Sequence, residues 1–309
     1  MRPLGGSWVT VTRPSPQTDR VIALVDLLAS RPHEAFTLAE LTRRLRVNKS
    51  TCHSMLTALA GAGWLLRDPY RKSYRLGPAL ATVGRAAASS FPALDIAHAA
   101  MVEVGLDARA HCAALAVVAD QLTVLDEVRD LHATGAGLRV GTSFPLRPPF
   151  GTAVIAWSDR DMVDAWLEHV SASARDRYRV TLAATRGRGY AVELSTTPEA
   201  RLRDVVAELR AGHATVSLPE LVEDLARDLA TRDDVLPIDL EADREYAVSA
   251  VNAPVLDRDG SVALVLSLTG FAQPLRGERV AAVGRRLTGT TGELSRALAG
   301  SLSEHPRVP

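Results

Sequence analysis

The chain has 309 residues, of which 47% are hydrophobic and 23% are charged, so it is long enough to fold as two domains with buried cores. Its 36 basic and 36 acidic residues give a formal net charge of zero. No apolar run approaches the roughly 18 residues of a transmembrane helix, and the first residues contain no apolar segment typical of a signal peptide. We therefore expect a cytoplasmic protein that does not enter a membrane.

The charge is divided unevenly along the chain. Residues 1–90 hold 13 Lys and Arg against 5 Asp and Glu, a net charge of +8, whereas the remainder holds 23 against 31, a net charge of −8. A basic head on an acidic body is typical of a DNA-binding domain joined to a sensor domain. The alternative is ordinary unevenness of surface charge.

The chemistry-bearing residues form none of the common catalytic or metal-binding motifs. Cys52 and Cys112 lie among apolar residues without CxxC spacing, so we expect reduced core thiols rather than a disulfide framework or a zinc site. The sequence has no Gly-x-Ser-x-Gly elbow, phosphate loop or dinucleotide-binding turn. It therefore predicts no catalytic residue, no metal and no cofactor.

The amino-terminal part begins with a tail and a first helix. Residues 1–17 contain Gly5, Gly6 and several prolines without an apolar period, which predicts a flexible tail. A helix is expected from Thr18 to Ala29, ending at Ser30–Pro32. Its predicted inner face consists of Ile22, Leu24, Val25 and Leu28.

A second helix is expected from Thr37 to Leu45. Thr37 and Glu40 have the spacing of a capping box, in which each residue satisfies a backbone N–H of the other. Leu38, Leu41 and Leu45 fall on one face of this helix, opposite Arg43 and Arg44.

A third helix follows after the short connection Arg46–Asn48. Asn48 is its expected N-cap, and its predicted buried stripe is Cys52, Met55, Leu56 and Leu59. The residues left facing outward are Lys49, Ser50, Thr51, His53, Ser54 and Thr57. Such short polar side chains suit the major groove of DNA, where they can meet base edges or phosphates. The alternative is an ordinary solvated helix face.

A hairpin is expected after Gly61 and Gly63. Residues 64–67 and 74–76 alternate in polarity, and Asp68–Ser73 has turn chemistry. Its cationic side chains are Arg67, Arg71, Lys72 and Arg75, with Tyr70 or Tyr74 packing beneath. We interpret this hairpin as the wing of a winged helix-turn-helix that contacts phosphates; the alternative is that its charges only aid solubility.

The run LAELTRRLRVNKSTCHSMLTALAGAGWLLRDPYRKSYRLG resembles the DNA-binding domain of IclR-type bacterial transcriptional regulators. In that family a Lys-Ser-Thr triplet opens the recognition helix and Tyr-Arg-Leu-Gly closes the wing. Ser54 stands where the family usually has Arg. The resemblance implies a winged domain at 18–78 and a linker helix at 79–92, which helps to pair protomers.

The second half reads as a mixture of helices and antiparallel strands, an α+β sheet domain. Helices are expected at residues 94–108, 152–157, 159–170, 182–186, 198–209, 218–230 and 279–298. Strands are expected at residues 113–118, 122–128, 138–141, 190–193, 246–255 and 262–269, the last apolar on both faces and hence central. The apolar positions of the first helix are Ile96, Met101, Val104 and Leu106.

The segments VLDEV, RVGTSFPL, RGRGYAVE and NAPVLDRDGSVALVLSLTG resemble the GAF-like effector-binding domain of the same family, over about residues 93–300 with an insertion near 200–243. The resemblance implies a pocket for a small organic acid. The residues that it places there are Arg147, Phe150, Gly151, Glu193, Ala250 and Ser267. The family's cysteine is replaced by Ala250, and the loop 147–151 is one residue shorter and richer in proline.

Each of these pocket residues has another interpretation. Arg147 is either a clamp for a carboxylate, because guanidinium offers a bidentate fork, or a surface arginine. Glu193 is either a pocket residue or a strand end. Trp157 and Trp166 are expected in the core rather than as a platform for a ligand.

The sequence thus predicts a winged helix-turn-helix head and a GAF-like body. The resemblance implies a regulator, not an enzyme, that binds a double-stranded, pseudo-palindromic operator as a dimer or tetramer and responds to a small effector. One alternative is a body that has lost its sensor function and serves only for assembly. The other is an enzyme with an attached DNA-binding domain, which would require a titratable cluster in a cleft.

Overall fold

The computed structural model describes residues 15–29, 31, 34–88, 92–135, 137–195, 226–232 and 235–301. The chain divides into two compact units, Met1–Phe91 and Pro92–Pro309. Several expectations lie outside the described residues: the tail at 1–14, the helix end at Ser30 and Pro32, the helix at 198–209, most of the helix at 218–230 and most of the insertion at 200–243.

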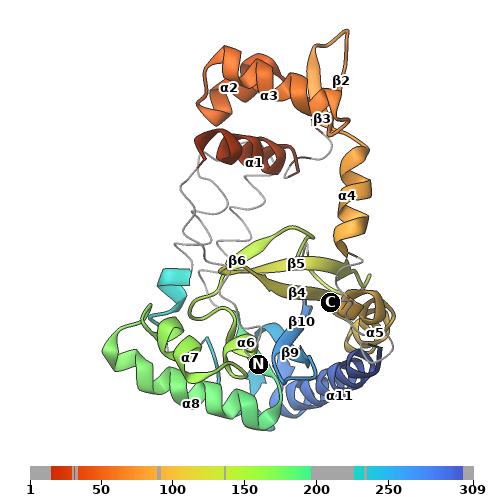
Figure 1. Cartoon of the computed structure of the whole chain (residues 1–309). Helices are drawn as coiled ribbons and strands as arrows, with labels where there is room; N and C mark the ends of the chain where they lie inside the picture. Colours follow the sequence, from red (N-terminus) through yellow and green to blue (C-terminus); the bar gives the residue numbers. More distant parts are fainter. Residues whose placement is uncertain are drawn as a thin grey trace. The chain divides into compact units, whose positions relative to one another are not determined.

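The first unit is built from three helices around one apolar core (Figure 1). They are α1 (Pro16–Ala29), α2 (Leu38–Leu45) and α3 (Lys49–Gly61). Leu24, Leu41 and Leu56, one from each helix, are fully buried in that core. The inner face predicted for α1 was wrong at Ile22, which is 54% exposed, because Val21 and Leu27 pack against the core instead.

Both predicted helix caps are confirmed. The Glu40 carboxylate accepts the Thr37 backbone N–H at 2.7 Å, and the Thr37 hydroxyl accepts the Glu40 N–H, which completes the capping box of α2. The pKa of the Glu40 carboxyl is lowered by the hydrogen bonds that the Thr37 backbone N–H and the Thr37 hydroxyl donate to it. Asn48 caps α3 by accepting the Thr51 backbone N–H at 2.8 Å.

The first unit also contains the predicted hairpin. Strands β1 (Phe36–Thr37), β2 (Leu65–Arg67) and β3 (Ser73–Leu76) form an antiparallel sheet in the order β1-β3-β2. Gly77 closes the hairpin by donating to the Trp64 carbonyl at 2.7 Å. A Cβ at Gly77 would collide with the backbone of Gly63 and Trp64, so glycine is required there. Helix α4 (Ala79–Ala88) follows.

The second unit is organised around an antiparallel sheet with the strand order β6-β5-β4-β10-β9-β7 in the described part of the chain. Its strands are β4 (His111–Val118), β5 (Gln121–Val128), β6 (Ser143–Pro145), β7 (Ala191–Leu194), β9 (Val248–Leu256) and β10 (Val262–Thr269). β10 lies between β4 and β9, which confirms the prediction of a central strand.

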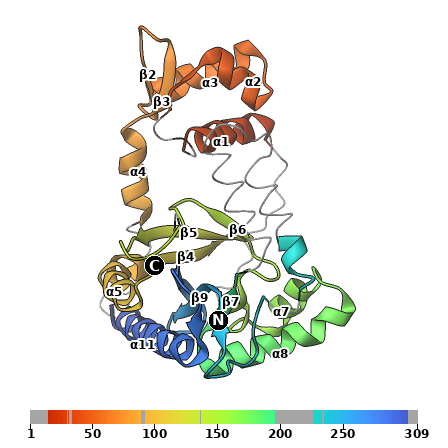
Figure 2. The same cartoon turned by 180° about the vertical axis from the view of Figure 1, so that it is seen from behind.

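Helices cover both faces of this sheet, as the views in Figures 1 and 2 show. One face, with Cys112, Leu266 and Val251, packs against α5 (Pro92–Ala108) and α11 (Gly277–Ser301). The opposite face, with Ala113 and Val265, packs against α6 (Thr152–Ile155). Both cysteines are buried free thiols, as predicted, and burial raises the pKa of Cys112 to about 12.

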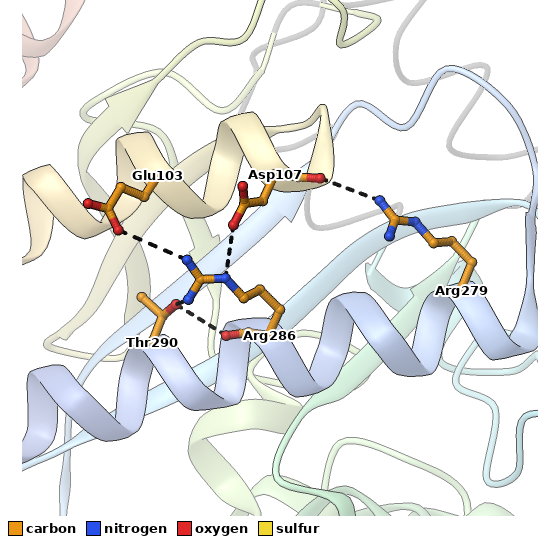
Figure 3. A network of polar contacts seen from close by, with 5 residues as sticks. All are labelled: Glu103, Asp107, Arg279, Arg286 and Thr290. Atoms are coloured by element: carbon orange, nitrogen blue, oxygen red, sulfur yellow. Dashed lines mark hydrogen bonds and ion pairs between the residues drawn. The ribbon is translucent and has the colours of Figure 1, made fainter.

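Ion pairs and hydrogen bonds connect α5 and α11 (Figure 3). Arg286 of α11 donates to the Asp107 carboxylate at 2.9 Å and to the Thr290 hydroxyl at 3.1 Å. Its guanidinium also lies 4.0 Å from the Glu103 carboxylate, and Arg279 donates to the Asp107 carbonyl at 3.4 Å. Asp107, Arg279 and Arg286 border a hollow of about 300 Å³.

A separate helical cluster adjoins the sheet. Helices α7 (Arg160–Leu167) and α8 (Ala172–Arg188) pack with Leu229 and Ala230 around Trp166 and Tyr178, whose rings meet edge to face at 5.3 Å. Trp166 is 2% exposed and Trp157 packs against the same cluster, so the prediction that both tryptophans belong to the core is confirmed.

Two predicted strands were wrong in part. Residues 138–141 form a turn, because Thr142 donates to the Arg139 carbonyl and Gly141 has a φ of +85°; β6 pairs with β5 instead. The strand expected at 246–255 is divided. Tyr246 lies in β8 (Glu245–Tyr246), which pairs with β11 (Leu275–Arg276), and β9 begins at Val248.

The helix predictions need smaller corrections. α8 begins at Ala172 rather than near Leu182, and α6 ends at Ile155, before Trp157. Leu106 of α5 is 60% exposed rather than buried. Within the described residues, no helix is long and apolar enough to cross a bilayer, and no group of His, Cys, Asp and Glu is arranged to hold a metal ion.

Candidate nucleic-acid interface and candidate ligand face

Helix α3 is fixed on one side and open on the other. Cys52, Met55 and Leu56 bury its inner face in the core of the first unit. Because residues three and four positions apart share a helix face, this anchoring fixes which side chains face solvent. The side chains of Lys49, Ser50, His53, Ser54 and Thr57 are exposed and that of Thr51 is half-buried.

Some of these polar groups already have partners within the helix. The Ser50 hydroxyl donates to the Asn48 side chain at 2.9 Å, and the Thr57 hydroxyl donates to the His53 carbonyl at 2.9 Å. A hydroxyl that donates in this way still has lone pairs to accept a further hydrogen bond. The exposed face therefore presents both donors and acceptors in one row.

The wing presents cations on a rigid turn. The Asp68 carboxylate accepts the backbone N–H groups of Tyr70 and Arg71 at 2.8 and 3.0 Å, which lowers its pKa. The Asp68 N–H in turn donates to the Ser73 carbonyl at 2.8 Å. Of the two tyrosines, Tyr74 packs in the core at 6% exposure, whereas Tyr70 is 94% exposed. The exposed cations are Arg67, Arg71, Lys72 and Arg75.

One exposed cation was missed from the sequence. Arg46 is the C-cap of α2, in the left-handed conformation at φ +52°, and it immediately precedes the turn into α3. Its charge and its place between the two helices were signals that could have included it. Arg44, by contrast, lies over the Phe36 ring at 5.3 Å, a cation–π arrangement that supports the core.

In the second unit, strand register brings three of the predicted pocket residues to one sheet face, which we call the ligand face. Glu193 is paired with Ala250 across β7 and β9, and Ser267 is paired with Asn252 across β10 and β9. Directly opposed residues of antiparallel strands share a face, as do residues two apart. Glu193 accepts a hydrogen bond from the Asn252 amide at 2.9 Å.

The other predicted pocket residues lie on the loop before α6. Gly151 has a φ of +81° and lies against the Leu146 side chain, so a Cβ there would clash. Phe150 packs against the helical cluster, and its ring also meets that of Phe144 in β6 at 5.4 Å; its carbonyl accepts the Trp166 indole N–H at 3.1 Å. Arg147 is half-buried, and its pKa is lowered by burial and by the nearby Arg227.

The ligand face contains polar residues that sequence reasoning missed. His111 is paired with Thr269, which is paired with Ala250. In the described part of the chain, the His111 Nε2 and Thr269 Oγ1 atoms are buried without a hydrogen-bond partner, while the His111 Nδ1 accepts the Asp130 N–H at 3.3 Å. The alternation of His111 with Ala113 and Leu115 was the available signal, but their strand neighbours come from distant segments.

The first unit has a three-helix core, a charged β-hairpin and a polar, exposed face on α3, the second helix of the helix-turn-helix pair. These features define the class of winged helix-turn-helix DNA-binding proteins. The model of the IclR helix-turn-helix domain matches residues 17–69 of this chain. The chain is 23% identical over 184 residues to the HTH-type transcriptional regulator XynR of Escherichia coli K12, covering 57% of this chain and 73% of XynR. Residues 17–69 therefore form a helix-turn-helix domain of the IclR type.

Solved structures resemble this chain in the fold of each unit. An IclR transcriptional regulator from Alicyclobacillus acidocaldarius superposes with a TM-score of 0.62 at 22% identity, covering 93% of this chain and all of that one (100%). An IclR homologue from Microbacterium hydrocarbonoxydans, complexed with 4-hydroxybenzoate, superposes with a TM-score of 0.61 at 16% identity, covering 91% and 99%. At these identities the likeness concerns the fold: a helix-turn-helix domain followed by an α/β domain with a curled sheet.

Proposed function

We propose that the chain regulates transcription by binding a pseudo-palindromic DNA operator through α3 and the wing. The observation that carries this proposal is the polar face of α3, which is held rigidly outward by Cys52, Met55 and Leu56. Its free N-terminal N–H groups favour a phosphate, and its side chains can meet base edges in the major groove. The proposed base or phosphate contacts are Lys49, Ser50, Thr51, His53, Ser54 and Thr57.

The wing would supply the phosphate contacts beside the groove. Arg67, Arg71, Lys72 and Arg75 are exposed on β2, β3 and their turn. Cations on a hairpin contact the backbone without reading sequence, so they add affinity and salt dependence. DNA binding would place the chain in the cytoplasm.

We propose that it binds as a homodimer or a tetramer, with the winged domain at 18–78 joined to the body at 93–300 through the linker at 79–92. In support, the side chains of residues 81–87 in α4 are exposed, including Val83 at 47%. An Ala-rich helix with such exposed side chains favours pairing with another copy. A two-fold dimer would place its recognition helices in successive major grooves about 34–36 Å apart.

Selection from a library of random duplexes tests the operator proposal. We expect the recovered duplexes to contain two inverted half-sites spaced by about one helical turn. Light scattering of the protein should give the mass of two or four chains. Recovery of duplexes without a shared sequence would refute specific readout.

We further propose that the ligand face binds a small organic acid, with Arg147, Phe150 and Gly151 on the loop and Glu193, Ala250 and Ser267 on the sheet. The support is that Glu193, Ala250 and Ser267 converge on one face, and that a structural relative was crystallised with 4-hydroxybenzoate. A ligand with different affinity for two arrangements of the DNA-binding units would shift DNA affinity by that difference. A thermal-shift panel of small carboxylic acids, followed by operator release, tests this.

A second candidate is a body that serves only for assembly. Ala153 and Val154 of α6 pack directly on Ala113 and Val265 of the same sheet face, so apolar side chains occupy part of it. This candidate predicts that no acid in the panel raises the melting temperature or releases the operator.

A further inference from the structure

A hollow of about 360 Å³ lies between α6, α7 and α8 in the helical cluster of the second unit (the helices are labelled in Figure 1). Its floor is apolar and includes Val163, Leu182 and Ala183. Sites for small molecules occupy roughly 300–1,000 Å³ and combine apolar walls with a few polar groups. The hollow therefore has the size and the lining of a small-ligand site.

The rim of the hollow is cationic. Among the described residues that line it, Arg160, Arg179 and Arg186 carry positive charge and Asp164 carries negative charge. This excess of guanidinium groups favours an anion, and guanidinium matches a carboxylate with two parallel N–H donors.

The ion pairs at the rim are exchangeable. Arg179 lies 3.0 Å from the Asp164 carboxylate and 3.6 Å from that of Asp176, and Arg160 lies 3.6 Å from Asp164. The side chains of Arg179 and Asp164 are 51% and 47% exposed. Ion pairs at such exposure contribute little to stability, because water competes for both partners. A ligand carboxylate can therefore replace Asp164 at small cost.

Arg186 has a different arrangement. It donates to the Ala156 carbonyl at 3.2 Å, which fixes its guanidinium beside the end of α6. A guanidinium has five N–H donors, so this bond leaves others to point at the hollow. Arg186 thus adds positive potential at a fixed position.

We propose that this hollow binds an organic carboxylate with an apolar body, whose carboxylate contacts Arg179 and whose body lies on Val163, Leu182 and Ala183. The site is separate from the ligand face that carries Glu193, Ala250 and Ser267, so it does not depend on the proposed effector. Helix α6 lies between the hollow and the ligand face: its Ile155 packs in the helical cluster, whereas its Val154 packs on the sheet. A ligand in the hollow contacts the helix that covers the ligand face.

Calorimetric titration of the full chain without DNA tests the charge and the apolar floor together. The probes are benzoate, its uncharged isostere benzamide, and inorganic phosphate. Benzoate binds at least about ten-fold more tightly than either, because only it satisfies both the guanidinium and the floor. Equal affinity for benzamide, equal affinity for phosphate, or no heat with benzoate up to about 10 mM overturns the proposal.

Variants locate the binding. Arg179→Ala lowers benzoate affinity at least about ten-fold and Arg179→Lys lowers it less, because lysine keeps the charge but not the fork. Asp164→Asn raises affinity, because it removes the competing carboxylate without changing the shape. Arg258→Ala, at the exposed turn between β9 and β10, is the matched control and leaves affinity unchanged.

A further variant separates this site from the proposed effector site. In an Arg147→Ala background, Arg179→Ala still lowers benzoate affinity at least about ten-fold if the ligand occupies the hollow. Loss of binding in Arg147→Ala with full binding in Arg179→Ala would assign benzoate to the ligand face and overturn the proposal. Since no DNA is present, failure of operator binding cannot produce either result.

Discussion

The two units place their polar side chains in opposite environments. On α3 of the first unit, Ser50, His53 and Ser54 are exposed, whereas on the ligand face of the second unit Asn252 and Ser267 are 9% and 2% exposed. An exposed polar face can be changed without disturbing the core below it. A buried polar face contributes to folding, because each group left without a partner carries a desolvation cost.

This difference in exposure predicts different effects of substitutions on stability and on binding in the two units. Substitutions on α3 should alter DNA binding with little change in stability, typically within about 0.5 kcal/mol. Substitutions on the ligand face should alter stability and ligand binding together. The following tests challenge this contrast, beginning with the largest expected effect.

Leu56→Ala removes a fully buried side chain that anchors α3. It should destabilise the first unit by about 2–5 kcal/mol, because apolar burial decreases and a cavity remains. Calorimetric thermal unfolding should show an early transition of the first unit with loss of DNA binding, while the second unit keeps its wild-type transition. A single transition that shifts as a whole would show that the units do not unfold on separate cores.

Asn252→Ala removes the amide that donates to Glu193 at 2.9 Å. A hydrogen bond to a charged group contributes about 1.5–3 kcal/mol, so chemical denaturation of the second unit should shift by that amount. Thr51→Ala on α3 is the comparison and should shift unfolding of the first unit by less than about 0.5 kcal/mol. Equal shifts in the two variants would remove the contrast between the faces.

Arg71→Ala combined with Lys72→Ala removes two exposed cations from the wing. Binding to every duplex should weaken by about ten-fold, and the slope of log affinity against log salt should fall by about one for each phosphate that the wing no longer neutralises. Fluorescence anisotropy at several salt concentrations measures both. An unchanged slope would mean that the wing does not contact phosphates.

Substitution of Glu40 should have the smallest effect on stability, and that effect should depend on pH. Hydrogen bonds from Thr37 lower its pKa in the folded state, so its contribution is present above the pKa of the unfolded chain and is lost as pH falls through the folded value. The capping box contributes about 1 kcal/mol. Glu40→Gln should remove this part of the pH dependence between neutral and acidic pH, as followed by unfolding of the first unit; an unchanged pH profile would contradict it.

Local chemistry made much of the first unit predictable. Thr37, Glu40 and Asn48 act on N–H groups within three residues, so their caps could be read from spacing alone. The wing was equally local, because Asp68 organises the turn that joins its own strands. The face of α1 was less certain, because Ile22 and Val21 are equally apolar and only the packing against neighbouring elements selects Val21.

The second unit depends on contacts between distant segments, and several predictions were wrong there. Tyr178, Leu182 and Thr185 form the buried stripe of α8, but the polar run 173–177 concealed where that helix begins. The pairing of His111 with Thr269 joins segments more than 150 residues apart, so no local pattern indicates it. The residues of the ligand face were therefore predicted only through the family resemblance, and His111 was not among the predicted pocket residues.

Retention of genomic duplex fragments by the purified full chain at low ionic strength tests the central claim most directly. Wild type should retain a small set of fragments that share inverted half-sites, Thr51→Ala with His53→Ala should retain a different set, and Arg71→Ala with Lys72→Ala should retain fewer fragments of the same set. If wild type retains no fragment, or if the Thr51 and His53 substitutions leave the retained set unchanged, α3 does not read DNA sequence and the account is contradicted.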